Sequence, residues 1–184
     1  GGGGTFVTKN DNSILVIAGG TGSAHFLLAS DWAGPFELQS ASLTSDGNDG
    51  ANNTNNGTNG GGGSSGDGGD AAGYSGNGTV GNNSVTYAIS GMPPHSIPQS
   101  FLNGGAGDAY GGGFGGAGGN TNFYGGGGGG YSGGAGARYL SKSFYGGGGG
   151  FKNNGSNQTN ILIGGASATD TNTTMSDGSV TITW

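Results

Sequence analysis

The sequence predicts a mainly β and irregular fold, in which packed helices of the polyglycine II type join a small antiparallel β-sheet and α-helix is essentially absent. Glycine supplies 51 of the 184 residues, and a glycine inside an α-helix costs roughly 1 kcal/mol relative to alanine. Leu, Ile, Val and Phe together number 28, which is too few for an ordinary side-chain core. Charged residues are only 8%, whereas disordered chains are usually highly charged.

A glycine run can be ordered when the backbone, rather than side chains, forms the interior. A helix of the polyproline II type has three residues per turn and no internal hydrogen bonds, so its N–H and C=O groups all point outward. Side by side, such helices satisfy one another's backbone groups, and glycine allows the closest approach. Collagen needs glycine at every third position, a period that this chain lacks. The runs 111–113, 125–130 and 146–150 are each long enough for about one to two turns.

Short apolar segments predict the strands of the sheet. Residues 5–8 follow the opening glycine run, and residues 9–12 have turn chemistry. Residues 13–18, the most hydrophobic run, predict a buried strand that completes a hairpin with the first. Further strands are expected at residues 85–89, 160–163 and 179–184, and residues 25–28 are expected as a loop or short strand over the core.

We expect a single glycine-rich domain over residues 1–184, because no linker divides the chain into two cores. Residues 44–84 are a polar Gly/Asn-rich insertion, for which two interpretations stay open: a flexible surface loop, or ordered glycine helices within residues 57–69 and 73–81. The opening glycines without a signal peptide predict a mature or trimmed form, and Trp184 is expected at the domain edge.

Aromatic residues recur between the glycine runs of residues 101–151. We expect them to wall the glycine core, and stacking against bound sugars is the alternative that we favour less. They are Tyr110, Phe114, Phe123, Tyr124, Tyr131, Tyr139, Phe144, Tyr145 and Phe151.

Composition also excludes several classes of function. The absence of cysteine excludes disulfides and cysteine zinc sites. Four Lys and Arg residues and a net charge of −6 do not supply the basic surface that nucleic acid requires. The chain has no apolar run near the roughly 18 residues of a membrane span, so we expect no membrane insertion.

Several segments, in this order along the chain, resemble motifs of the glycine-rich domain family. Residues 1–7 with ILVIAGG at 14–20 resemble the opening hairpin of that family. The later segments are SFLNGG at 100–105, GFGGAGG at 113–119, GGGGGGYSGG at 125–134 and DGSVTIT at 177–183. The domain occurs in the ectodomains of anaplastic lymphoma kinase and leukocyte tyrosine kinase and in bacterial, protist and viral surface proteins.

The resemblance implies polyglycine-type helices in a hexagonal-like array and an extracellular, non-catalytic role. In the receptor members the domain binds a protein ligand. This chain has no cysteines and nothing that resembles a kinase or a transmembrane segment, so it is more similar to a stand-alone surface, fibre or adhesin protein. The resemblance assigns ligand binding to no particular residue here.

We predict no catalytic or cofactor-binding residues. The segment 76–81 matches G-x-G-x-x-G, a pattern that composition alone produces in so glycine-rich a chain. His25 and His95 are the only histidines, and we expect an isolated surface or packed histidine at each rather than a Ser–His–Asp triad. Calcium is the one metal considered, because side-chain oxygens could bind it. Ordinary acidic turns are the interpretation that we prefer, and the residues concerned are Asp46, Asn48, Asp49, Asp67 and Asp70.

Seven asparagines begin the glycosylation pattern N-x-[ST]. If the protein is secreted by a eukaryote, we expect glycans on some of them. They are Asn52, Asn56, Asn77, Asn82, Asn154, Asn157 and Asn172.

The leading hypothesis is a non-catalytic, extracellular structural or adhesive protein, in which a rigid glycine-rich module assembles into a fibre or another homo-oligomer. The alternative is a monomeric recognition module at the cell surface that binds a protein ligand or a glycan. A fibre subunit needs two complementary patches, whereas a recognition module needs one patch that faces a foreign ligand.

Overall fold

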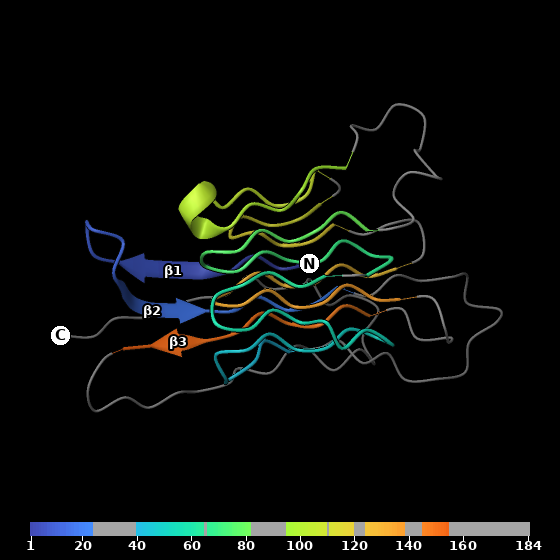
Figure 1. Cartoon of the computed structure of the whole chain (residues 1–184), viewed down its shortest axis with the longest axis horizontal. Helices are drawn as coiled ribbons and strands as arrows, with labels where there is room; N and C mark the ends of the chain where they lie inside the picture. The colour runs from blue at the N-terminus through green and yellow to red at the C-terminus, as the bar shows by residue number, and fades with distance from the viewer. Residues whose placement is uncertain are drawn as a thin grey trace, which may run out of the picture.

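The structure, a computed structural model, describes residues 1–23, 40–64, 66–81, 95–109, 111–119, 124–138 and 145–154. Its regular elements are the strands β1 (Thr5–Thr8), β2 (Ile14–Ala18) and β3 (Lys152–Asn153) and the 3-10 helix η1 (Phe101–Asn103). The rest of the described chain is extended or turning, without α-helix, which confirms the predicted fold class (Figure 1). The strands predicted at 85–89, 160–163 and 179–184 and the segment 25–28 lie outside the described residues.

The three strands form one antiparallel sheet in the order β1-β2-β3. The predicted hairpin is confirmed: Phe6 lies opposite Ile17, and an irregularity after Val7 shifts the register. The expectation of a buried strand holds only at Ile17, which is fully buried. Leu15 is 41% exposed and the other residues of β2 are half-buried, because the described sheet is covered over only part of this strand. The two-residue β3, in which Lys152 lies opposite Ile17, is not among the predicted strands, because so short a polar segment has no alternating pattern.

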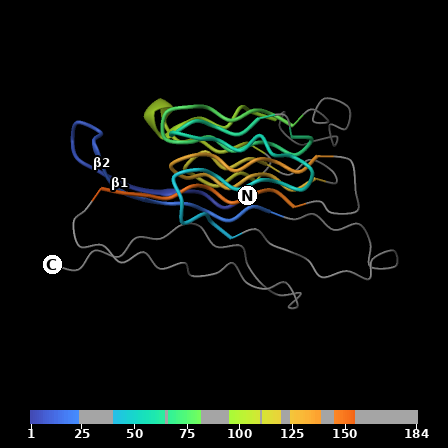
Figure 2. The same cartoon turned by 60° about the horizontal axis from the view of Figure 1, so that its bottom comes forward.

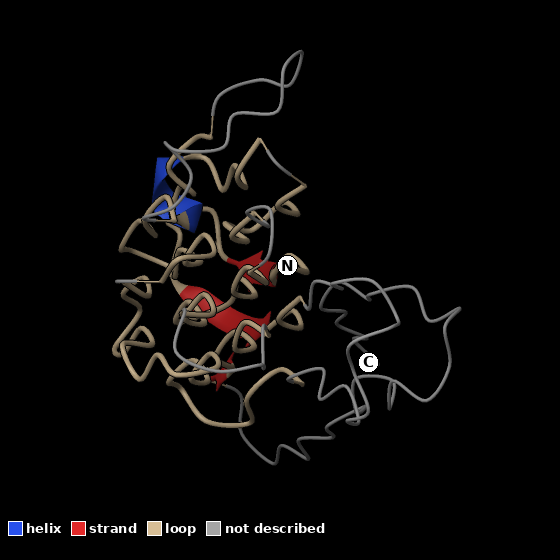
Figure 3. Cartoon of the chain, turned by 90° about the vertical axis from the view of Figure 1, so that its right-hand side faces the viewer, coloured by secondary structure: helices blue, strands red, loops and turns tan. Residues whose placement is uncertain are grey.

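Most of the described chain consists of extended, undulating runs that lie side by side along one direction (Figures 1 and 2). Seen along their length, the runs appear as small coils arranged beside one another, with the sheet among them (Figure 3). We call these packed runs the glycine lattice. Its members are residues 1–4, 19–23, 47–50, 57–63, 66–72, 115–119, 125–130, 133–137 and 145–150, which backbone hydrogen bonds join to one another.

Residues 125–130 lie inside the lattice with six neighbouring runs around them. Backbone hydrogen bonds join them to residues 1–4, 19–23, 66–72, 115–119, 133–137 and 145–150. Within this run, successive amides donate to different neighbours: Gly127 to Gly69 at 2.9 Å, and Gly128 to Gly147 at 2.8 Å. A run that bonds outward in every direction has no internal bonds of its own, which is the property of the polyglycine II helix.

The period of the runs is three residues. The carbonyl oxygen of Gly126 accepts a hydrogen bond from the amide of Ser23 at 2.9 Å. Three residues further on, the carbonyl oxygen of Gly129 accepts from Gly20 of the same neighbouring run at 2.8 Å. Because residues three apart face the same neighbour, each run turns once every three residues, as the sequence predicts.

Close approach is what makes glycine necessary in the lattice. A Cβ at Gly127 would lie 2.1 Å from the carbonyl oxygen of Gly134, and a Cβ at Gly129 would lie 2.1 Å from that of Gly115. Neither glycine has a positive φ, so the backbone conformation itself would suit other residues. The requirement is therefore for space between neighbouring backbones, not for conformational freedom.

Residues 47–50, 57–63 and 66–72 of the 44–84 insertion belong to the lattice. The amide of Gly57 donates to the carbonyl of Gly133 at 2.8 Å, and that of Ala71 donates to Gly134 at 3.0 Å. Of the two interpretations, residues 57–63 and 66–72 therefore follow the ordered one. Composition alone could not decide this, because the partners of these backbone groups lie more than sixty residues away in sequence.

Side-chain burial is slight by comparison. Among the described residues the hydrophobic cluster consists of Ala51, Tyr124 and Ala137, with Tyr145 packed against it. Most other buried apolar residues are alanines. The hydrophobic effect scales with the apolar area removed from water, so side-chain burial makes a smaller contribution here than in an ordinary domain, and backbone hydrogen bonding a correspondingly larger one.

Candidate functional site

Asp70 is a buried carboxylate at a junction of four segments. Its Oδ1 accepts from the Gly136 amide at 2.8 Å and from Asn53 Nδ2 at 3.3 Å. Its Oδ2 accepts from the Gly66 amide at 2.9 Å and from Thr79 Oγ1 at 2.5 Å. Four donors match the acceptor capacity of one carboxylate. Because these donors come from different segments, the Asp70 side chain joins those segments to one another.

Burial raises the pKa of Asp70 above its ordinary value of 3.8, because loss of hydration outweighs the opposing effect of its hydrogen-bond donors. Asn53 supports the same junction. Its Nδ2 also donates to the carbonyls of Ser64 and Gly136, each at 3.0 Å. The pair is thus a structural polar centre within the insertion. Sequence reasoning considered Asp70 only as a calcium ligand and did not consider Asn53, because their partners are backbone groups of distant runs.

A second polar cluster pairs His95 with Asp108. His95 Nδ1 lies 2.9 Å from Asp108 Oδ2, and the Asp108 side chain is fully buried. The Ser96 amide donates to Asp108 Oδ1 at 3.2 Å, and Ser96 Oγ accepts from the Ala109 amide at 2.9 Å. The imidazole is packed, with 10% of its side-chain surface exposed. A packed histidine is one of the two environments expected from the sequence. Its partner was not predicted from the sequence.

This cluster has one feature of a catalytic triad, a carboxylate that orients an imidazole. The hydroxyl nearest in sequence, Ser96 Oγ, accepts a hydrogen bond from the Ala109 amide, which lies 13 residues further along the chain. His25, the other histidine, lies outside the described residues. The arrangement therefore fixes residues 95–96 to residues 108–109, and it assigns no nucleophile.

The G-x-G-x-x-G match at residues 76–81 is accounted for by packing. A Cβ at Gly78 would lie 2.1 Å from the carbonyl oxygen of Asp70, and a Cβ at Gly81 would lie 2.1 Å from that of Asp67. Both glycines accommodate neighbouring runs of the same chain. A dinucleotide loop uses its glycines to let phosphate approach, and here backbone occupies that space.

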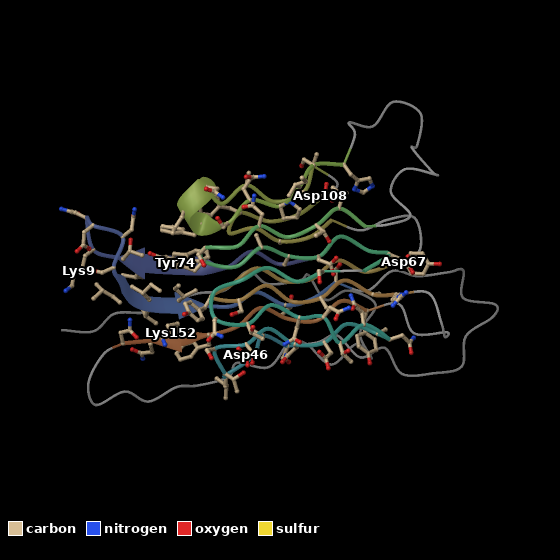
Figure 4. The ribbon with its side chains drawn as sticks, viewed as in Figure 1. Lys9, Asp46, Asp67, Tyr74, Asp108 and Lys152 are labelled. Atoms are coloured by element: carbon tan, nitrogen blue, oxygen red, sulfur yellow. The ribbon has the colours of Figure 1, made fainter. Side chains whose placement is uncertain are left out.

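Four aromatic rings form a row at the sheet end of the molecule. Phe6 of β1 stacks on Phe101 of η1 with ring centroids 4.5 Å apart. Phe101 stacks in turn on Tyr74, and Tyr74 on Tyr131, at 5.8 and 6.3 Å. The Lys152 ammonium lies 5.3 Å from the Tyr131 ring centroid. Figure 4 shows Tyr74, Lys9 and Lys152 at this end and Asp67 at the opposite one.

Of the nine aromatic residues predicted to wall the glycine core, the aromatic row, Phe6–Phe101–Tyr74–Tyr131, contains Tyr131 alone. Tyr124 is 7% exposed, and Tyr145 packs against its cluster, as expected for rings at the edge of the core. Phe114 differs, because 66% of its surface is exposed. Tyr110, Phe123, Tyr139 and Phe144 lie outside the described residues.

Two of the candidate calcium ligands have hydrogen-bond partners within the protein. Asp70 is engaged by four protein donors, as described above, and Asn48 Nδ2 donates to the Ser40 carbonyl at 2.8 Å. Among the described residues, no group of three or more His, Cys, Asp or Glu side chains is placed to hold a metal ion. Calcium binding stays the interpretation that we favour less.

Four of the seven predicted glycosylation sites are described, and they differ in their surroundings. Asn52, Asn77 and Asn154 are exposed, whereas Asn56 is half-buried. Asn56 Nδ2 donates to the Gly47 carbonyl, and Asn154 Nδ2 to the Ile14 carbonyl at 3.0 Å. Asn82, Asn157 and Asn172 lie outside the described residues.

No helix in the described part of the chain is long and apolar enough to cross a membrane. Comparisons of the chain with protein-family models, with curated proteins and with solved structures gave no match. The resemblance to the glycine-rich domain family therefore rests on the sequence segments alone.

Proposed function

We propose that this chain is a non-catalytic, extracellular structural or adhesive protein, with the glycine lattice as its rigid body. The observation that supports the proposal is the environment of residues 125–130, which six neighbouring runs surround and bond. Because each run is held from several sides, the displacement of one run breaks bonds to several others. Such a body transmits force with little deformation, which suits a structural or adhesive element.

The extracellular location is supported by the sequence. The family that the chain resembles is extracellular, and seven glycosylation patterns lie in the sequence. The proposal requires no cofactor. It also requires no catalytic group, and the His95–Asp108 pair has a structural role in it.

Assembly into a fibre or another homo-oligomer would proceed through the sheet rather than through the lattice. Most glycines of the described lattice already face backbone of their own chain, so their close packing is used within the molecule. β1 and β3 are the outer strands of the described sheet. β1 consists of uncharged TFVT, whereas β3 contains Lys152, and lysine on an edge strand opposes pairing with another chain.

A monomeric recognition module is the second candidate, and exposed apolar side chains favour it. Phe114, Ile97 and Leu102 have 66%, 51% and 48% of their surfaces exposed. Exposed large apolar residues are common singly and mark binding surfaces when they gather, so this candidate requires the three side chains to form one patch. The ligand would be a protein or a cell-surface glycan.

Electron microscopy of the purified protein, with mass from light scattering, separates the two candidates. Regular filaments or a defined oligomer of the 17.5 kDa chain would support assembly. A monodisperse monomer at all concentrations would contradict it and favour the recognition module, which a glycan array and cell binding would then test. A hydrolytic activity that copurifies with the protein and is lost in His95→Ala would overturn the non-catalytic proposal.

A further inference from the structure

Asn-Gly and Asp-Gly sequences are chemically vulnerable bonds, and this chain contains many of them. The backbone nitrogen of the glycine attacks the side-chain Cγ, forming a five-membered succinimide. The Cγ–Nδ2 bond of asparagine breaks and ammonia leaves with the amide proton, whereas aspartate loses water. Water then opens the ring to aspartate or isoaspartate. The reaction requires a glycine nitrogen that is free to leave its hydrogen bond and a backbone that can rotate.

In every such pair that the structure describes, the glycine amide donates a hydrogen bond. The acceptor is a backbone carbonyl in all cases but Gly60, whose amide donates to Ser132 Oγ at 3.0 Å. The other distances range from 2.8 Å for Gly57 to 3.1 Å for Gly104. The described pairs are Asp46–Gly47, Asp49–Gly50, Asn56–Gly57, Asn59–Gly60, Asp67–Gly68, Asn77–Gly78 and Asn103–Gly104.

In six of these pairs the glycine is buried in or against the lattice; these are Gly47, Gly50, Gly57, Gly60, Gly68 and Gly78. Space around them is short: a Cβ at Gly57 would lie 2.2 Å from the Gly61 carbonyl oxygen, and one at Gly78 would lie 2.1 Å from that of Asp70. Rotation of such a glycine toward the preceding side chain requires neighbouring runs to separate. Local opening of packed backbone costs free energy up to that of global unfolding.

Asn103–Gly104 is different in each of these respects. Asn103 ends η1, and both residues are exposed. The Gly104 amide bonds only three residues back, to Phe101, at 3.1 Å, and no heavy atom lies within 4 Å of a Cβ position at Gly104. We propose that Asn103 is a modification site of this protein, where succinimide formation converts asparagine to aspartate and isoaspartate while the lattice protects the other described pairs.

The conversion would change the sheet end of the molecule. Asn103 Nδ2 donates to Asn77 Oδ1 at 2.9 Å, and the same oxygen accepts from the Ser100 amide at 2.9 Å. A carboxylate at position 103 loses this donor and places negative charge against an acceptor oxygen. Isoaspartate also inserts a methylene into the backbone. Both products loosen η1, and Phe101 of η1 belongs to the aromatic row.

The test is to age the full-length protein at mildly alkaline pH and physiological temperature, and to map aspartate and isoaspartate by peptide mass spectrometry. We expect conversion at Asn103 to be at least about tenfold faster than at Asn56, Asn59 and Asn77, because those three require local opening of the lattice. Equal conversion at any of those three, or conversion at Asn103 as slow as theirs, would overturn the proposal.

Two controls assign the difference to the fold. The chain aged in denaturant should convert all four asparagines at similar rates. If Asn103 keeps the same advantage in denaturant, local sequence and not packing determines it, and the proposal fails. Asn103→Gln should abolish the signal at position 103 without accelerating the other three sites, and faster conversion at Asn56 or Asn59 in this variant would also contradict the proposal.

Discussion

Replacing Gly127 with alanine adds a single methyl group at the centre of the glycine lattice. The new Cβ would lie 2.1 Å from the carbonyl oxygen of Gly134 and 2.6 Å from its carbonyl carbon. Ordinary contact begins at 3.4 Å, so the two backbones must separate by roughly 1.3 Å in an interior packed as densely as an organic crystal. No flexible side chain is available to move in their place.

The cost can be worked out from the bonds that hold this position. The Gly127 amide donates to Gly69, and its carbonyl accepts from Gly118. The displaced run 133–137 is also held, through the bond from the Gly134 amide to Gly128. Three backbone bonds at about 1 kcal/mol each, with about 1–3 kcal/mol for overpacking, give a loss of roughly 4–6 kcal/mol. The free energy of unfolding of a typical domain is about 5–15 kcal/mol. The Gly127→Ala protein should therefore be unfolded or only marginally stable.

Guanidinium unfolding followed by aromatic fluorescence measures this loss. Gly61→Ala is the matched control, because its φ is not positive and the nearest atom to its Cβ, the Thr58 carbonyl oxygen, lies 3.0 Å away. We expect the free energy of unfolding of this control to fall by less than about 1 kcal/mol, because the reduced freedom of the unfolded chain offsets part of the steric cost. A Gly127→Ala protein within about 1 kcal/mol of the natural one, or a control that loses equally, would refute the lattice argument.

Three further predictions concern the side chains around the lattice. Because the pKa of Asp70 is raised, its contribution to stability is fully present below pH 3.8 and is lost as pH rises through the folded-state pKa. The stability advantage of the natural chain over Asp70→Asn should therefore shrink as pH rises above 3.8, and a constant or growing difference in unfolding free energy would contradict this. Asn53→Ala removes donors to Ser64 and Gly136 and should cost about 2–3 kcal/mol in denaturant unfolding, whereas exposed Asn52→Gly, at a φ of 55°, should change stability by less than about 1 kcal/mol. Phe101→Ala breaks the aromatic row and should cost about 2 kcal/mol, with hydrogen exchange accelerated at the sheet end and not at residues 125–130; uniform acceleration would show that the row supports the whole molecule.

The fold class could be predicted because its cause is compositional. Runs of glycine exclude α-helix, and their outward-pointing backbone groups require partners, so packed runs follow from 125–130 and 146–150 alone. The hairpin of β1 and β2 could be predicted from the β-branched residues of its second strand. Each of these inferences uses only neighbours in sequence.

What could not be predicted depends on distant partners. Nothing near Asp70 in sequence indicates Gly136 as its donor, and nothing near His95 indicates Asp108. β3 exists because Lys152 reaches Ile17, far away along the chain. Sequons likewise identify Asn56 and Asn77 equally, although their amide groups have different partners in the folded chain. Local patterns determine the kind of element, and packing determines which side chains meet.

Amide hydrogen exchange at residues 125–130 tests the lattice most directly. The amides of residues 126–129 all donate within the protein, to Ser23, Gly69, Gly147 and Gly2. They should therefore exchange only through an opening nearly as costly as global unfolding, and the far-ultraviolet circular dichroism spectrum should have a polyproline II signature. Rapid exchange of these glycine amides, together with a spectrum dominated by random coil, would contradict a packed glycine lattice.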